Sequence, residues 1–160
     1  MAGTPDFRLQ ALKIAQGELG VKEVPMGSNW GPRVSQYLKA AGITFPAAWC
    51  ASFITWCFDK AGKKITFPGP ALVQDWDNWA AKNGEVVTRP FKGDLVTFDW
   101  NGDHWFDHIG IVEKVLALRP FNVYLFQSIE GNSGDQVARR THWSNSQGTR
   151  FIRIKDDQPA

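Results

Sequence analysis

The amino-acid sequence predicts an α+β domain in which N-terminal helices pack on an antiparallel β-sheet. In the first half of the chain, apolar residues recur at the three- and four-residue spacing of amphipathic helices. In the second half, short apolar runs are separated by turn residues such as Asn101-Gly102 and Gly131-Asn132, as is typical of strands. The sequence contains no internal repeat and no linker, so we expect residues 1–160 to form a single domain.

A glycine closes each of the four expected helices, because glycine readily adopts the left-handed conformation that follows a helix. The expected helices run from Thr4-Pro5 to Gly20, from Gly31-Pro32 to Gly42, from Trp49 to Ala61 and from Pro70 to Gly84. The third of them is apolar on nearly every side, which predicts the central buried helix. The expected strands are Leu95–Phe98, Ile109–Val115, Val123–Ile129, Gln136–His142 and Phe151–Ile154.

The composition limits the possible functions. The net charge of +2 is too small to indicate nucleic-acid binding. The eight tryptophans are many for so short a chain, and several could stack on sugar rings while others fill the core. The N-terminus has no secretory signal pattern, and the longest apolar run, of about 12 residues, is too short to span a bilayer. We therefore expect synthesis in the host cytoplasm without a signal peptide and no membrane insertion.

The two cysteines, Cys50 and Cys57, differ in the chemistry that they could support. On one helix they would lie roughly 10 Å apart, too far for a disulfide. Cys50 follows the expected helix start, where unpaired amide groups favour a reactive thiolate. Cys57 lies deeper in the helix and is expected to be inert core. A cysteine near a helix start is also often only a small buried residue.

A thiol nucleophile needs a general base and a group that orients the base. Among the three histidines, His108 begins an apolar strand, His104 lies in the loop before it, and His142 lies late in the chain. Glu130 follows another apolar strand, and Asn132 lies two positions later, on the same face if the strand continues. Taken singly, residues of these types in such positions are more often structural than catalytic.

Four motifs resemble those of the CHAP family of cysteine amidases and endopeptidases, relatives of the NlpC-type hydrolases. They are Ala48-Trp49-Cys50-Ala51-Ser52-Phe53, Lys92-Gly93-Asp94-Leu95-Val96, Asp107-His108-Ile109-Gly110-Ile111-Val112 and Ile129-Glu130-Gly131-Asn132, in the order of the family. The resemblance covers about residues 7 to 155 and implies a small papain-like fold. It also implies that Cys50 is the nucleophile, His108 the base and Glu130 the orienting residue, with Asn132 as a further polar catalytic position.

The implied reaction is cleavage of an amide bond in the peptidoglycan stem peptide or cross-bridge, with amidase and endopeptidase both open. Backbone amides at the start of the helix could stabilise the oxyanion. Asn29 is a candidate side-chain donor, and Trp49 and Trp105 are candidate substrate-binding residues. Ordinary packing is the alternative for tryptophans in loops.

The loop before His108 partly imitates a calcium-binding loop through Asp99, Asn101, Asp103 and Asp107. Some CHAP relatives bind calcium. However, His104 stands where such a loop has glycine, and Gly110 stands where it has glutamate. We therefore interpret the segment as a hairpin turn and expect that no metal or cofactor is required, with calcium as the alternative.

The resemblance suggests a monomeric phage endolysin or virion-associated lysin, which reaches the cell wall by holin-type release or virion delivery. A secretion-system effector amidase would use the same chemistry. A non-catalytic wall-binding or virion structural protein on the same fold is an alternative of a different class. A papain-like acyltransferase or peptidase that acts on proteins is a further one.

Overall fold

The computed structural model describes residues 6–146 and 148–155, which form four helices and six strands. The helices are α1 (Phe7–Gly17), α2 (Val34–Ala40), α3 (Cys50–Lys60) and α4 (Val73–Lys82). The strands are β1 (Val86–Val87), β2 (Leu95–Phe98), β3 (His108–Arg119), β4 (Val123–Glu130), β5 (Ala138–Trp143) and β6 (Arg150–Ile152). The strands form one antiparallel sheet in the order β1-β6-β2-β3-β4-β5. The predicted α+β fold with helices followed by an antiparallel sheet is confirmed.

Helices α1, α2 and α4 begin later than the sequence suggested, and α2 begins at Val34 rather than at Gly31-Pro32. The side chain of Asp6 accepts a hydrogen bond from the Arg8 amide at 2.9 Å and caps α1, whereas the expected start at Thr4-Pro5 lies outside the described residues. Helix α4 begins at Val73 rather than at Pro70. The carbonyl oxygen of Pro70 instead accepts hydrogen bonds from the side chains of Thr55 and Trp76, which anchors this segment to the core.

The strands also differ from the expected ranges at their ends. Strand β3 is longer than predicted, since it continues to Arg119 in a hairpin with β4 whose far half is exposed. Strand β5 begins at Ala138 rather than Gln136, and β6 ends at Ile152 rather than Ile154. The two-residue strand β1 was not predicted, because Val86–Val87 is too short to show a period.

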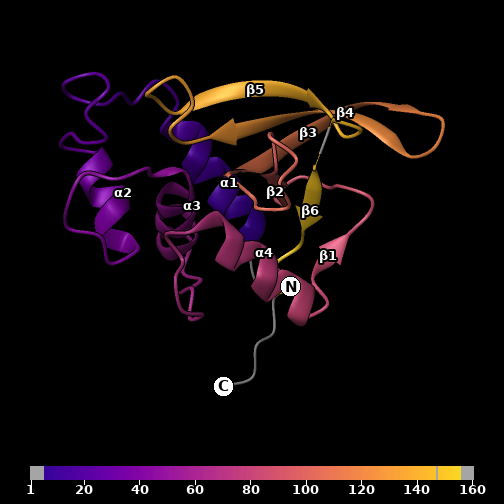
Figure 1. The fold of residues 1–160 in the computed structure, drawn as a ribbon, viewed down its shortest axis with the longest axis horizontal. Coiled ribbons are helices and arrows are strands. Elements are labelled where there is room, and N and C mark those ends of the chain that lie inside the picture. The colour runs from indigo at the N-terminus through magenta and orange to yellow at the C-terminus, as the bar shows by residue number, and fades with distance from the viewer. Residues whose placement is uncertain (1–5, 147, 156–160) are drawn as a thin grey trace, which may run out of the picture.

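The main core lies between the helices and one face of the sheet (Figure 1). Every residue of α3 from Cys50 to Phe58 is buried, as expected for the central helix. Helices α1 and α3 both contact β3, and α2 packs on the outer side of α3. Of the described helices, none is long and apolar enough to cross a lipid bilayer.

The opposite face of the sheet is concave and encloses a second, smaller core of Val96, Phe98, Val112, Phe126 and Phe151. The rings of Phe98 on β2 and His142 on β5 have centroids 4.7 Å apart, although β3 and β4 lie between these strands. In a flat sheet, three strand spacings would separate β2 from β5 by roughly 14 Å. The sheet therefore curls around this face and brings side chains of non-adjacent strands together.

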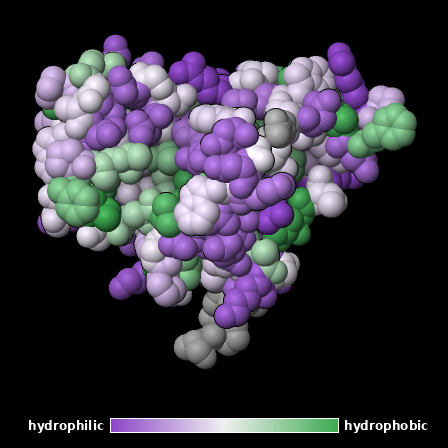
Figure 2. All heavy atoms as spheres, viewed as in Figure 1, coloured by the Kyte–Doolittle hydropathy of each residue, from purple (hydrophilic) through white to green (hydrophobic). Residues whose placement is uncertain are grey.

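The hairpin that joins β3 to β4 extends away from the helices and appears in orange in Figure 1. Its exposed apolar residues include Leu118 and Phe121, which are 61% and 98% exposed. Figure 2 views the molecule from the same side as Figure 1. The surface seen there is largely hydrophilic in the middle, with apolar groups towards its left and right margins.

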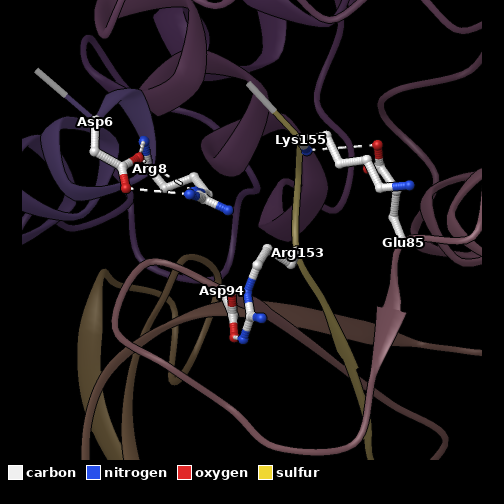
Figure 3. Close-up of polar contacts among 6 residues, drawn as sticks. All are labelled: Asp6, Arg8, Glu85, Asp94, Arg153 and Lys155. Atoms are coloured by element: carbon white, nitrogen blue, oxygen red, sulfur yellow. Dashed lines mark hydrogen bonds and ion pairs between the residues drawn. The ribbon is translucent and has the colours of Figure 1, made fainter. Parts of the chain in front are cut away.

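The motif Lys92-Gly93-Asp94 forms the turn that leads into β2. Asp94 is fully buried, accepts a hydrogen bond from the Phe91 amide at 2.7 Å, and receives two hydrogen bonds from the Arg153 guanidinium at 2.7 and 2.8 Å (Figure 3). Gly93 has a φ of +87°, and a Cβ there would meet the Cβ of Arg8 at 3.0 Å. This motif is therefore explained by structure: it ties the segment after β6 to the start of β2.

We predict that Asp94→Ala lowers the free energy of unfolding by roughly 3 kcal/mol, because it leaves a guanidinium and a buried amide without their acceptor. Urea denaturation would measure the loss. Arg8→Ala is the control, since it removes a partly exposed pair with Asp6 and a contact with the Phe7 ring, and should cost less than about 1 kcal/mol. Equal effects of the two substitutions would contradict the proposed importance of the buried pair.

Candidate active site

Cys50 is the first residue of α3, and its thiol is 7% exposed. The residue before the helix, Trp49, provides no side-chain hydrogen bond to cap it. The Sγ atom of Cys50 lies 4.0 Å from the carbonyl oxygen of Asp107, the residue that precedes β3. The start of the helix thus meets the start of β3, as the order of the motifs suggested.

Trp49 and Asn29 are joined through one buried carboxylate. The indole of Trp49 donates to Oε2 of Glu23 at 2.8 Å, and the backbone N–H of Asn29 donates to Oε1 at 2.8 Å. Trp49 is completely buried and stacks on Tyr37, so it has no surface to offer a ligand. This position contradicts the expectation that Trp49 binds substrate; it anchors the start of α3 instead. Asn29 is half-buried in a loop that this arrangement holds against the helix start.

His108 and Glu130 form a buried pair on the concave face of the sheet. His108 is the first residue of β3, Glu130 is the last residue of β4, and Nε2 of the imidazole lies 2.8 Å from Oε1 of the carboxylate. His108 is 5% exposed and Glu130 1%. Since Nε2 faces Glu130, the Nδ1 side of the ring is left for the Cys50 thiol, whose interaction with the imidazole contributes to the raised pKa of His108.

The second carboxylate oxygen of Glu130 has two further partners. Nε2 of His142 lies 2.6 Å from Oε2, and the Ser128 hydroxyl donates to the same oxygen. Sequence reasoning noted His142 only as one of three histidines and did not single out Ser128. The period of two along β4 places Ser128 on the same face as Glu130, which was a usable signal. His142 lies on the neighbouring strand β5, opposite Phe126 rather than opposite Glu130, so local pattern alone did not predict the contact.

Burial and hydrogen bonding oppose each other in this pair. Burial disfavours the charged form of His108, but its hydrogen bonds with Cys50 and Glu130 outweigh this and raise the pKa of His108 to about 9. Burial would likewise raise the pKa of Glu130, but hydrogen bonds from His108 and His142 lower it to about 2. At neutral pH the arrangement therefore holds an imidazolium between a thiol and a carboxylate.

Two glycines allow the close approach of these elements. A Cβ at Gly110 would lie 2.7 Å from Cγ of Glu130, so a side chain there would occupy the path of the glutamate. A Cβ at Gly131 would lie 2.7 Å from Cβ of Phe53 on α3. The absence of side chains thus lets Glu130 cross β3 and lets the end of β4 touch the helix of Cys50.

Trp100 stacks on the imidazole of His108, with ring centroids 4.7 Å apart, and is 54% exposed. Trp105 from the same loop is 51% exposed and thus accessible to a ligand. Asn132 lies beyond Glu130 in a left-handed turn with a φ of +54°. Within residues 6–146 and 148–155, no hydrogen bond joins its side chain to His108 or Glu130.

The loop before His108 gathers carboxylate oxygens of Asp99, Asp103 and Asp107 within 4.8 Å of one another. Hydrogen bonds already engage two of these groups: Asp99 accepts from the amides of Gly102 and His104, and Asp103 accepts from the amide of Trp105. Asn101 donates its side-chain amide to Asp103. These bonds account for the shape of the turn without an ion, although the three carboxylates could hold a cation. The expectation that no metal is required, with calcium as the alternative, stays a prediction.

We predict that Gly110→Ala displaces Glu130 and lowers the free energy of unfolding by about 1–3 kcal/mol through overpacking. The rate of Cys50 alkylation by iodoacetamide at neutral pH should fall as well, because the displaced carboxylate no longer supports the imidazolium. Peptide mapping by mass spectrometry would locate the alkylated thiol. Gly17→Ala is the control, since a Cβ there meets nothing within 4 Å. A Gly110→Ala variant as reactive as the wild type would refute the steric argument.

Comparison with known proteins gives one match. The family model described as CHAP domain matches residues 42–132, more than half of the chain, and this range includes Cys50, His108 and Glu130. No curated protein and no solved structure matches the sequence. The order of the motifs, the confirmed α+β fold and this match agree, and the chain belongs to the CHAP domain family.

Proposed function

We propose that this protein hydrolyses an amide bond in the stem peptide or cross-bridge of peptidoglycan, with Cys50 as the nucleophile. CHAP domains are in general cysteine- and histidine-dependent amidohydrolases of peptidoglycan. The observation that carries the assignment of residues is the buried series Cys50, His108 and Glu130, in which the imidazole lies between a thiol and a carboxylate.

In the proposed mechanism, the Cys50 thiolate attacks the amide carbonyl carbon while His108 is protonated. The tetrahedral intermediate collapses when His108 gives its proton to the leaving amine, and a thioester remains. His108, now neutral, takes a proton from water, and the resulting hydroxide attacks the thioester. The acid product leaves and the thiolate–imidazolium pair is restored. Glu130 fixes the ring throughout and stabilises the positive charge in the steps in which His108 is protonated.

The start of α3 supplies donors for the oxyanion of both tetrahedral intermediates. The first hydrogen bond of the helix runs from the Phe53 amide to the Trp49 carbonyl at 2.9 Å. The amides of Cys50, Ala51 and Ser52 precede it, and Trp49 does not cap them with its side chain. An oxyanion formed at Cys50 would therefore meet unpaired N–H groups and the positive end of the helix dipole.

The half-exposed tryptophans beside this series are suited to a glycopeptide substrate. Trp100 covers one face of His108, and Trp105 projects from the same loop. Flat aromatic surfaces stack on sugar rings and on apolar parts of peptides. We propose that this loop forms one wall of the substrate groove and that Asn29, held near the start of α3 through Glu23, lies towards the other.

For the biological setting we propose a phage lysin that acts as a monomer on the cell wall, after holin-type release or virion delivery. The support for it is the resemblance of the four motifs to CHAP lysins. A secretion-system effector amidase would carry out the same chemistry. A non-catalytic wall-binding or virion structural protein would need no buried imidazolium beside a thiol, so the geometry favours an enzyme.

We predict that Cys50→Ala abolishes digestion of purified peptidoglycan, because the variant has no thiol to form the thioester. Mass spectrometry of the fragments made by the wild type would identify the bond: free lactyl groups on muramic acid indicate an amidase, and new amino termini indicate an endopeptidase. Cys57→Ala is the matched control. Cys57 is fully buried, and burial raises the pKa of its thiol, so this variant should stay active but lose about 1 kcal/mol of stability. Equal digestion by Cys50→Ala would refute the nucleophile.

We predict that kcat/KM for a soluble muropeptide falls as the pH rises through about 9, because the pKa of His108 is raised from 6.5 to about 9 and the imidazolium is lost above it. Glu130→Gln should move this basic limb towards pH 6.5, because the neutral amide no longer stabilises the imidazolium. A basic limb at the same pH in both proteins would contradict the role of Glu130. Circular dichroism would check that the variant is folded.

A further inference from the structure

The mechanism above uses one oxygen of the Glu130 carboxylate, and the structure fills the other. Oε1 faces His108, whereas Oε2 accepts hydrogen bonds from the Ser128 hydroxyl and from Nε2 of His142 at 2.6 Å. A single buried carboxylate therefore joins two imidazoles that come from strands β3 and β5.

We propose that His142 is a positioning residue for the hydrolysis: its N–H holds Oε2 of Glu130, so that Oε1 stays directed at His108 and the carboxylate stays ionised. The proposal rests on the proposed function, since it assigns His142 a part in orienting the base. His142 does not touch Cys50 or the expected path of the substrate in the described contacts and acts only through Glu130.

The surroundings of His142 fix the direction of its ring. It lies opposite Phe126 in the register of β4 and β5, with ring centroids 5.6 Å apart, and 4.7 Å from the ring of Phe98. Its side chain is 20% exposed, so one edge meets solvent while the other meets the carboxylate. The ring is therefore held between two phenylalanines and presents Nε2 to Glu130 without needing another partner.

Glu130 needs this donor because it is nearly inaccessible to water. A carboxylate that is 1% exposed loses its hydration, and hydrogen bonds must replace it for the charge to persist. Without His142, burial would raise the pKa of Glu130, and the carboxylate could turn about its terminal torsion towards Ser128. Either change weakens the support for the imidazolium of His108, and so for the thiolate of Cys50.

The direction in which the basic limb of activity moves when His142 is lost distinguishes this proposal from the alternative that His142 competes with His108 for Glu130. The titratable groups that face Glu130 and His108 are Cys50, His142 and each other. If His142 donates as a positioning group, its loss moves the basic limb of activity to lower pH. If His142 instead competes as a cation for the charge of Glu130, its loss strengthens the Glu130–His108 pair and moves the basic limb to higher pH.

Two substitutions isolate the donor from the ring. His142→Phe keeps a flat ring between Phe98 and Phe126 but has no N–H, whereas His142→Gln keeps an N–H but loses the ring. We expect His142→Phe to lower kcat about tenfold with little change in KM and to shift the basic limb to lower pH. His142→Gln should recover most of the kcat and most of the pH of the basic limb. Thr141→Ala, at the exposed neighbouring position of β5, is the control and should match the wild type.

A second measurement does not depend on peptidoglycan. The pH at which alkylation of Cys50 by iodoacetamide reaches half its maximal rate should rise in His142→Phe and return in His142→Gln. If His142→Phe failed to fold, His142→Leu would serve as the variant without a donor. A shift in alkylation without any hydrolysis by the wild type would support the role of His142 while refuting the proposed reaction.

Two outcomes would overturn the proposal. An unchanged kcat, basic limb and alkylation profile in His142→Phe would show that His142 only packs against the phenylalanines. A basic limb at higher pH would show that it competes with His108 for the carboxylate.

Discussion

The charge of Glu130 is the constraint on which the site depends. A carboxylate that is 1% exposed can remain ionised only if hydrogen bonds replace its hydration, and His108, His142 and Ser128 supply them. These partners come from three strands, so the carboxylate requires β3, β4 and β5 to be paired in register. His142 lies opposite Phe126 rather than opposite Glu130, so its contact with the carboxylate runs along the strands and depends on this register.

The need to place the Glu130 carboxylate among its partners explains Gly110 and Gly131 better than turn formation does. Gly110 and Gly131 lie on either side of Glu130: the first leaves room for its side chain above β3, and the second leaves room for Phe53 of α3. A Cβ at either position would lie 2.7 Å from the side chain of Glu130 or of Phe53, so the carboxylate or the helix would have to move. The glycines of the motifs around Glu130 are therefore explained by close packing as well as by the proposed chemistry.

The parts of the structure that local pattern determines could be predicted from the sequence. Helix α3, the position of Cys50 at its start, and the strands that begin with His108 and end with Glu130 follow from apolar runs and their boundaries. Contacts that depend on tertiary arrangement could not be predicted. Trp49 resembled a ligand-binding residue beside a nucleophile, but Glu23, far away in sequence, takes its indole into the core. His142 contacts Glu130 through the register of β4 and β5, and Trp100 contacts His108 through the path of one loop.

The two layers of the domain contribute different halves of the chemistry. The helical layer supplies the thiol and the uncapped amides, and the concave face of the sheet supplies the imidazole and its carboxylate. They meet where the end of β4 touches α3 at Gly131 and Phe53, and where Asp107 approaches Cys50. Because each half is buried against the other, a loosened contact between the layers would separate thiol from base before it disturbed either one. Correct packing of the two layers is therefore a condition for the proposed pairing of the Cys50 sulfur with His108.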